Sequence, residues 1–497
     1  MLPSLTSHSE YIFFVNDSLK SIEIPKAHTD VAGKLALLDL TPIRLLMLDL
    51  YCPEKGRIGY APEDLLRTFL AMVFCGITSP SRWVEGYLQD KSGFYAVISG
   101  FEVGEIPSVG CLYQFIDRLM QLPRFCKAHQ IKLKRKRLTR KQKQQLKDDK
   151  TKVTKRHVGI VAKLAKRFRR IDANAQEVYV PHDEAIANAI LEVCCLSESQ
   201  RRGLLDKNHL FVAGDGTKLA VHGNSYGKKV CSCDDKHCDC KRYYNAPMAS
   251  IGYDAYRDAY VYSHSLYQLT SCSMSHTAEL PTYLMMTTGC RHDSVTASFA
   301  MNRATQRVSI DKAAFDAVLV RSYRTHDATA FYQMADDLWQ SEVFIPLNTT
   351  NEGNFKQIPM ATISPKGIPI CRENYQMYYS GHCKDRDRQK WRCPLKVKNA
   401  DSTCHCSTSN YGRVVYTHTP ENLRIFPKTP RSSPTFKKVY DHRTAAERVF
   451  KRQKLDFKLT QFKTRSKGRH LFYALLTAIA VHVETWYRLD SLAIIKL

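Results

Sequence analysis

The sequence predicts an α/β protein that carries an all-helical module at its N-terminus and an insertion inside its α/β region. Three observations support this fold class. Apolar residues recur at helical spacing from about Thr41 to Leu122, strand-like stretches begin at His209, and a loop-rich, cysteine-bearing segment from about Asn348 to Pro434 separates them from a last helical region. A chain of 497 residues is long enough for more than one hydrophobic core.

Five regions follow from these changes along the chain. They are a helical N-terminal domain (1–125), a basic helical arm and linker (126–205), the first part of the α/β core (206–347), the cysteine-bearing insertion (348–435) and the C-terminal helices of the core (436–497).

The N-terminal helices have recognisable start signals. Pro62-Glu63-Asp64 precedes apolar residues at helical spacing, and Pro107-Ser108 precedes a second helix that contains Phe115 and Leu119. By pattern alone this region is a packing domain.

Positive charge is concentrated in two segments. The chain has 74 Lys and Arg against 48 Asp and Glu, a net charge of +26. Nineteen basic and two acidic residues lie between Lys127 and Arg170, and twelve basic and three acidic residues lie between Lys437 and Arg469. Such density favours a polyanionic partner, because neutralised phosphates release counterions. A solvated basic tail and an RNA-binding patch are the alternatives. The densest run supplies four candidate DNA contacts: Lys134, Arg135, Lys136 and Arg137.

The α/β region is expected to alternate short strands and helices. A first strand, Leu210–Ala213, ends at Gly214-Asp215-Gly216, where an Asp-Gly pair is also typical of a hairpin turn. The remaining predicted elements are strands at Lys218–His222 and Ala259–Leu266, a helix at Val295–Val308, a buried strand at Ala317–Val320, a helix at Ala328–Trp339, a strand at Val343–Ile345 and a helix from Asp441 to about Leu459.

The chain has seventeen cysteines and no visible secretory signal, which favours free thiols and metal ligands over disulfides, and eight of the cysteines fall in two clusters of four. Four thiols within ten residues suit tetrahedral zinc, and reduced surface cysteines are the alternative. The first cluster is Cys231, Cys233, Cys238 and Cys240. The second, weaker cluster is Cys383, Cys393, Cys404 and Cys406.

A second spacing pattern lies near the C-terminus. Tyr440, Arg443, Glu447 and Lys454 are separated by three, four and seven positions, so they share one stripe if a single helix reaches back to Tyr440. One carboxylate between cations suits a site that holds a metal and contacts phosphates. The alternative is a surface helix with ordinary Arg–Glu pairing.

These four residues resemble the signature of a large group of insertion-sequence DDE transposases. Further similar segments are Pro107-Ser108 with Phe115 and Leu119, Gly214-Asp215-Gly216-Thr217, and Arg291-His292-Asp293-Ser294. The resemblance covers most of residues 60–490. It implies an RNase H-like mixed sheet flanked by helices, interrupted by the insertion, beside the all-helical N-terminal module.

The resemblance also implies a catalytic site. Asp215 and Glu447 would be two of three carboxylates that hold two Mg²⁺ or Mn²⁺ ions, while Tyr440, Arg443 and Lys454 would contact DNA. The position expected for the second carboxylate holds Tyr323, and a phenol is a poor substitute for a hard anionic ligand. Either Asp327 has taken over this role, or the chain binds DNA without cutting it. Otherwise Asp327 is the N-cap of the next helix.

The expected function is therefore metal-dependent cleavage at element ends and strand transfer to a target, on double-stranded DNA and in a homodimer. The alternatives are a DNA-binding relative that has lost catalysis and a zinc-stabilised nucleic-acid-binding protein. Met1–Glu10 has no secretory pattern, and Leu471–Val483 is too short to span a bilayer, so we expect a cytoplasmic, nucleoid-associated protein of a prokaryotic-type cell with a buried helix at Leu471–Val483.

Overall fold

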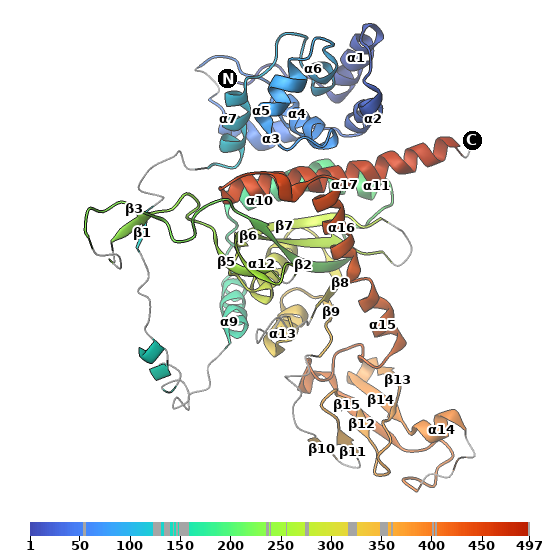
Figure 1. Cartoon of the computed structure of the whole chain (residues 1–497). Coiled ribbons are helices and arrows are strands. Elements are labelled where there is room, and N and C mark those ends of the chain that lie inside the picture. The colour runs from blue at the N-terminus through green and yellow to red at the C-terminus, as the bar shows by residue number, and fades with distance from the viewer. Residues whose placement is uncertain are drawn as a thin grey trace.

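The protein is arranged as a helical N-terminal region, a central sheet with helices, and a group of small sheets at the opposite end (Figure 1). The computed structural model describes residues 1–52, 56–122, 131–133, 140–142, 144–145, 148, 159–234, 238, 240–254, 256–273, 278–316, 326–347, 356–358, 361–399, 402 and 405–495.

The N-terminal region is helical, as predicted. The helix α4 begins at Pro62, and the Ser108 hydroxyl caps α7 by accepting a hydrogen bond from the Cys111 N–H at 3.2 Å. The helices are α1 (His8–Ser18), α2 (Thr29–Ala36), α3 (Ile43–Met47), α4 (Pro62–Phe74), α5 (Pro80–Trp83), α6 (Phe94–Ser99) and α7 (Val109–Leu119).

A mixed sheet forms the centre of the molecule. Its strand order is β5-β6-β2-β8-β9, and β7 pairs with β6 beside β5. The strands β5, β7 and β2 run antiparallel to β6, whereas β8 runs parallel to β2 and β9 parallel to β8. The strands are β2 (Leu210–Ala220), β5 (Ser250–Asp254), β6 (Ala259–Ser271), β7 (Pro281–Thr288), β8 (Ile310–Phe315) and β9 (Glu342–Phe344).

The strand β2 corrects one prediction. It runs without interruption through Gly214-Asp215-Gly216, and each residue from Val212 to Ala220 has a partner on β6. The expected break and the separate strand at Lys218–His222 are therefore wrong. Gly214 is required here because a Cβ would lie 2.5 Å from the Phe315 ring and 2.6 Å from the Tyr267 hydroxyl.

The position of strand β8 differs from a second sequence prediction. The sequence predicted a buried strand at Ala317–Val320, but the strand lies at Ile310–Phe315, and residues 317–320 fall outside the described residues. The flanking elements were close to their predictions: α12 spans Asp293–Ala304, and α13 spans Thr329–Asp337.

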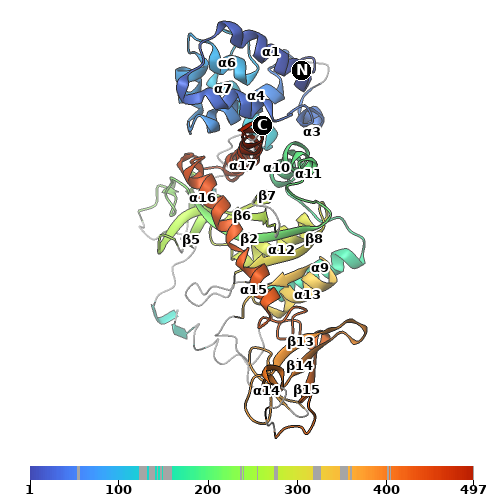
Figure 2. The ribbon, with the colours of Figure 1, turned by 90° about the vertical axis from the view of Figure 1, so that its right-hand side faces the viewer.

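Helices cover both faces of the sheet (Figure 2). Because side chains alternate along β2, Val212 points into the core formed with α9 (Ile160–Ala173), α12 and α13, whereas Ala213 points toward α15 (Pro434–Asp441) and α16 (Thr444–Leu455). The predicted helix from Asp441 to about Leu459 corresponds to α16, which begins at Thr444. A single helix does not reach back to Tyr440, because His442 and Arg443 separate α16 from α15.

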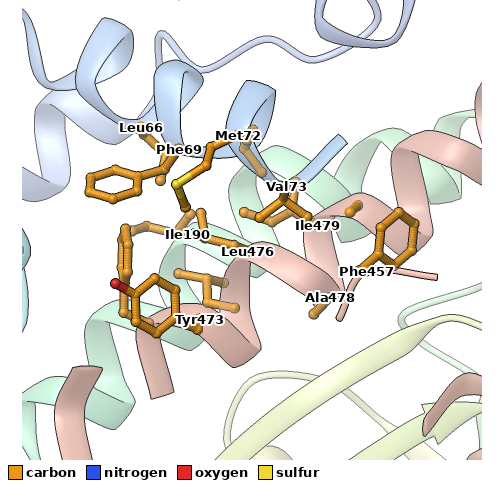
Figure 3. Close-up of a cluster of buried hydrophobic side chains, with 14 of the residues drawn as sticks. Leu66, Phe69, Met72, Val73, Ile190, Phe457, Tyr473, Leu476, Ala478 and Ile479 are labelled. Carbon is orange, nitrogen blue, oxygen red and sulfur yellow. The ribbon is translucent and has the colours of Figure 1, made fainter. Parts of the chain in front are cut away.

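The long helix α17 (Lys467–Ile495) joins the N-terminal helices to the sheet. Figure 3 shows Phe69 and Val73 of α4 beside Leu476 and Ile479 of α17, together with Ile190 of α10 (His182–Leu191). The predicted buried helix at Leu471–Val483 is confirmed as part of α17, since its apolar side chains are buried. Within the described part of the chain, no helix is both long and apolar enough to cross a membrane.

The insertion contains strands as well as loops. Two small antiparallel sheets have the orders β10-β11-β12 and β13-β14-β15, and a third small sheet, β1-β4-β3, lies outside the insertion beside the central sheet. The remaining elements are α11 (Ser197–Arg201), β1 (Ile131–Leu133), β3 (Lys228–Lys229), β4 (Lys241–Tyr243), β10 (Lys356–Ile358), β11 (Ala361–Ile363), β12 (Pro369–Ile370), β13 (Tyr378–Cys383), β14 (Arg388–Arg392), α14 (Pro394–Lys398) and β15 (Val414–His418).

Candidate functional site

Two aspartates meet on adjacent strands at the centre of the sheet. Gly214 pairs with Phe315 in the parallel ladder between β2 and β8, so the residues that follow them, Asp215 and Asp316, lie at the same level. Neighbouring strands are about 4.8 Å apart, and both side chains belong to the face covered by α15 and α16. The sheet register therefore places two carboxylates side by side under these helices.

The turn between α15 and α16 brings three residues of the C-terminal pattern to this face. The Tyr440 hydroxyl lies 3.4 Å from Oδ1 of Asp316, and the Arg443 guanidinium lies 3.4 Å from Oδ2 of the same residue. Arg443 also binds Oε1 of Glu447 at 2.8 Å. Asp316 and Glu447, far apart in the chain, are thus bridged by one guanidinium. Asp316 is not among the carboxylates predicted from the sequence, although an aspartate directly after a short apolar strand was a usable signal.

A fourth carboxylate, Asp293 at the start of α12, lies near Asp215 but approaches β2 from the opposite face of the sheet, the face covered by α12. A Cβ built on Gly216 would lie 2.7 Å from Oδ1 of Asp293, so the absence of a side chain at Gly216 lets Asp293 approach β2. No hydrogen bond or ion pair to the Asp293 carboxylate occurs among the described residues. The sequence analysis had noted Asp293 only as part of a similar segment.

The electrostatics of the site reflect this crowding. Desolvation, followed by the negative charges of Asp293 and Glu447, raises the pKa of Asp215 to about 7, although the Gly216 N–H and Arg443 oppose the shift. Burial lowers the pKa of Lys454, although the charge of Asp215 opposes this shift. A bound cation would relieve the repulsion, and carboxylate oxygens are the ligands that Mg²⁺ and Mn²⁺ prefer. Among the described residues, however, no three carboxylates have ligand oxygens that all lie within 4.8 Å of one another.

Asp327 has a different role from the one the sequence suggested. Its side chain is 1% exposed and forms a bidentate pair with Arg424 at 2.9 and 2.7 Å, while the Tyr332 hydroxyl lies 3.3 Å away. A carboxylate held in this way is not available to a metal beside Asp215. The helix that follows is capped at Ala328, so the N-cap alternative for Asp327 is also wrong. Tyr323 lies outside the described residues.

The first cysteine cluster is compact and could bind a metal such as zinc. The sulfurs of Cys231, Cys233, Cys238 and Cys240 all lie within 4.8 Å of one another. For the second cluster, Cys404 lies outside the described residues, and the search of the described ones finds no second such group. Cys393 is buried.

The predicted basic contacts are described in part. Lys134, Arg135, Lys136 and Arg137 lie outside the described residues. The end of the same basic segment forms α9, which buries Phe168 against α12 and leaves four basic side chains exposed, namely Lys163, Lys166, Arg167 and Arg170.

Comparison with protein-family models and with curated proteins finds no match for this chain. Its function must therefore be inferred from its residues and their geometry.

Proposed function

We propose that this protein is a DDE transposase, which cleaves DNA at the ends of a mobile element and joins the freed ends to a target. Asp215, Asp316 and Glu447 are its three catalytic carboxylates. The observation that carries the proposal is the register of β2 and β8, which sets Asp215 beside Asp316 on the face where α16 presents Glu447.

The proposed fold of the core is RNase H-like. The mixed sheet, flanked by helices on both faces and followed by the insertion and the helix that carries Glu447, supports this assignment. The helical N-terminal region and the insertion lie at opposite ends of the core, which leaves the carboxylate site between them.

Each residue of the site has a role that its contacts support. Asp215, Asp316 and Glu447 would hold two Mg²⁺ ions, with Asp293 as an additional negative group. When bound, paired ions supply an activated oxygen nucleophile and stabilise the leaving oxygen of a phosphodiester. Tyr440 and Arg443 orient Asp316 by direct contact, and Lys454 adds positive charge near Asp215 for an approaching phosphate.

The DNA partner is supported by charge. The exposed basic side chains of α9 and the twelve basic residues between Lys437 and Arg469 lie in segments that belong to or adjoin the core. Such segments bind the phosphate backbone without reading sequence. A homodimer that pairs two element ends remains an expectation from the resemblance.

A relative that binds DNA without cutting it is the second candidate. The contacts of Arg443 with Asp316 and Glu447 favour it, because a guanidinium that neutralises both carboxylates competes with a metal for them.

Zinc is the metal we propose for the cluster of Cys231, Cys233, Cys238 and Cys240. Thiolates select zinc over magnesium, so this structural site is chemically separate from the carboxylate site.

The decisive experiment uses linear DNA that carries the sequences flanking the protein's own coding region. The protein is incubated with this DNA and Mg²⁺ or Mn²⁺, and new 3′-hydroxyl ends are mapped by sequencing. We expect discrete ends with the natural chain and none with Asp215→Asn or Glu447→Gln.

Asp327→Asn is the matched control, since it changes an acidic residue close in sequence to Asp316 but outside the proposed site. If the natural chain slows the migration of the DNA in a gel but produces no new ends with either metal, the non-catalytic candidate is favoured. Absence of both binding and cleavage would overturn the proposal.

A further inference from the structure

The four-cysteine cluster closes a very small sheet. The strand β3 ends at Lys229, two positions before Cys231, and β4 begins at Lys241, directly after Cys240. The central strand β4 pairs with β3 on one side and with β1 on the other. The connection between β3 and β4 is therefore the segment that carries the four cysteines.

The arrangement of the thiols matches a tetrahedral metal site. The Cys231 sulfur lies 3.2 Å from that of Cys233 and 3.6 Å from that of Cys238, and the sulfurs of Cys233 and Cys240 are 3.8 Å apart. Zinc–sulfur bonds of about 2.3 Å at tetrahedral angles separate the sulfurs by about 3.8 Å. The Lys229 ammonium donates to the Cys233 carbonyl, which places a positive charge beside ligands that would carry excess negative charge.

Among its described residues, this hairpin has short strands and exposed apolar side chains. The strands β3 and β4 have two and three residues. Tyr226 is 59% exposed and Val230 55% exposed, so neither supplies a core for it. Two-residue and three-residue strands without an apolar core are not stable alone, whereas a bound structural metal supplies folding free energy directly.

The third strand of this sheet comes from the basic arm. In the pairing of β1 with β4, Ile131 lies opposite Tyr243 and Leu133 opposite Lys241. The strand β1 falls inside the segment Lys127–Arg170, which holds nineteen basic and two acidic residues. The edge that docks this segment is thus provided by a strand whose position depends on the cysteines.

We propose that zinc bound by Cys231, Cys233, Cys238 and Cys240 is the clip that holds β1, the N-terminal part of the basic arm, on the protein through the β4–β1 pairing, while α9 at the other end of the basic segment packs on the core. Loss of zinc frees β1 from β4. A second consequence rests on the proposed function. Zinc occupancy sets the affinity for the DNA backbone, because a docked β1 holds neighbouring positive charge beside the core.

The first test measures the metal itself. Purified full-length protein is analysed for zinc by mass spectrometry, and zinc is exchanged for Co²⁺ to record the absorption of a tetrahedral thiolate site. We expect about one zinc per chain. The double variant Cys233→Ser/Cys238→Ser should lose it, and Cys52→Ser, which removes an exposed cysteine outside the cluster, should retain it.

The second test follows β1. Trypsin cleavage after Lys132, a residue within β1, is timed by mass spectrometry for the natural chain, the two variants and chelator-treated protein. We expect cleavage at least tenfold faster in the double variant and after chelation, because a paired strand must open before it is cut. Circular dichroism melting of the helices reports whether the rest of the fold is intact and should be unchanged.

The third test measures affinity for a random-sequence 30-base-pair duplex at several salt concentrations, without added Mg²⁺ or Mn²⁺. The zinc-free forms should bind about tenfold more weakly with a shallower salt dependence.

Absence of zinc from the natural chain, or unchanged cleavage at Lys132 when zinc is lost, overturns the clip. Faster cleavage at Lys132 with no DNA binding by any form supports the clip and contradicts the proposed DNA-directed function.

Discussion

The cysteine cluster and the carboxylate site bring their groups together over very different lengths of chain. The four thiols all lie between Cys231 and Cys240. The carboxylates come from Asp215 on β2, Asp316 directly after β8 and Glu447 on α16. A local cluster needs only a turn of the chain to form. The carboxylate site exists only when two strands are in the right register and α16 packs on the sheet, so changes that shift this packing should affect it first.

The largest expected effect separates Asp316 from Asp327. We expect Asp316→Asn to lower metal-dependent DNA cleavage by roughly 10³-fold, because it removes a charge from a proposed metal ligand. Asp327→Asn, which keeps a polar side chain facing Arg424, should lower it by less than about tenfold. Cleavage rates measured on the flanking-sequence DNA check this. Equal losses in both variants would mean that the sheet register does not select the second carboxylate.

For the free energy of unfolding we expect the opposite order, with a larger loss on substitution of Asp327 than of Asp316. Asp327→Ala leaves Arg424, whose side chain is 11% exposed, without its buried partner, which costs about 3 kcal/mol of unfolding free energy. Asp316→Ala should cost far less or even stabilise the fold, because it relieves repulsion among neighbouring carboxylates. Urea denaturation of both variants measures the difference. A larger loss for Asp316→Ala would contradict the assignment of Asp327 as the structural carboxylate.

Acid should destabilise the packing that the carboxylate site depends on. His264 and His470 lie with their Nδ1 atoms 2.8 Å apart between β6 and α17, and burial lowers their pKa values to about 3 and about 4. Burial also lowers the pKa of His482 on α17 to about 4. These values lie below the ordinary 6.5, so the unfolded chain takes up protons first, and stability present above pH 6.5 is lost as the pH falls toward 4.

Between pH 7 and pH 5 this loss amounts to about 2 kcal/mol for each such histidine. His482→Gln, which cannot be protonated, should lose about 2 kcal/mol less than the natural chain over this range, as measured by urea denaturation at both pH values. His418→Gln, at an exposed position of β15, is the control and should follow the natural chain. If His482→Gln loses as much unfolding free energy between pH 7 and pH 5 as the natural chain, the groups responsible lie elsewhere.

The smallest expected effect concerns Lys454. If its ammonium contacts a phosphate, Lys454→Ala should lower the slope of log affinity against log salt by about one unit without changing sequence preference. Titration of the random duplex at several salt concentrations measures the slope. A slope identical to that of the natural chain would show that Lys454 serves the carboxylates alone.

Much of the local structure could be predicted from the sequence. Pro62, Ser108 and the periodicity of Leu471–Val483 predicted helices that the structure contains, because helix starts and buried faces are encoded in neighbouring residues. The strand at Gly214-Asp215-Gly216 could not be predicted in this way. Two glycines around an aspartate are typical of a turn, and only the close approach of Phe315, Tyr267 and Asp293 explains them within a strand.

The sequence alone determined the concentration of positive charge, the grouping of the four cysteines and the candidate roles of Asp215, Glu447, Tyr440 and Arg443. Tertiary structure decided the second carboxylate. Asp316 and Asp327 both follow β8 in the sequence, one directly and the other twelve positions after its end, and their types do not distinguish them. Pairing of β8 with β2 sets Asp316 beside Asp215, while Arg424, contributed by the distant insertion, binds Asp327. The physical reason is that strand register and buried ion pairing depend on partners far away in the chain, which local spacing does not encode.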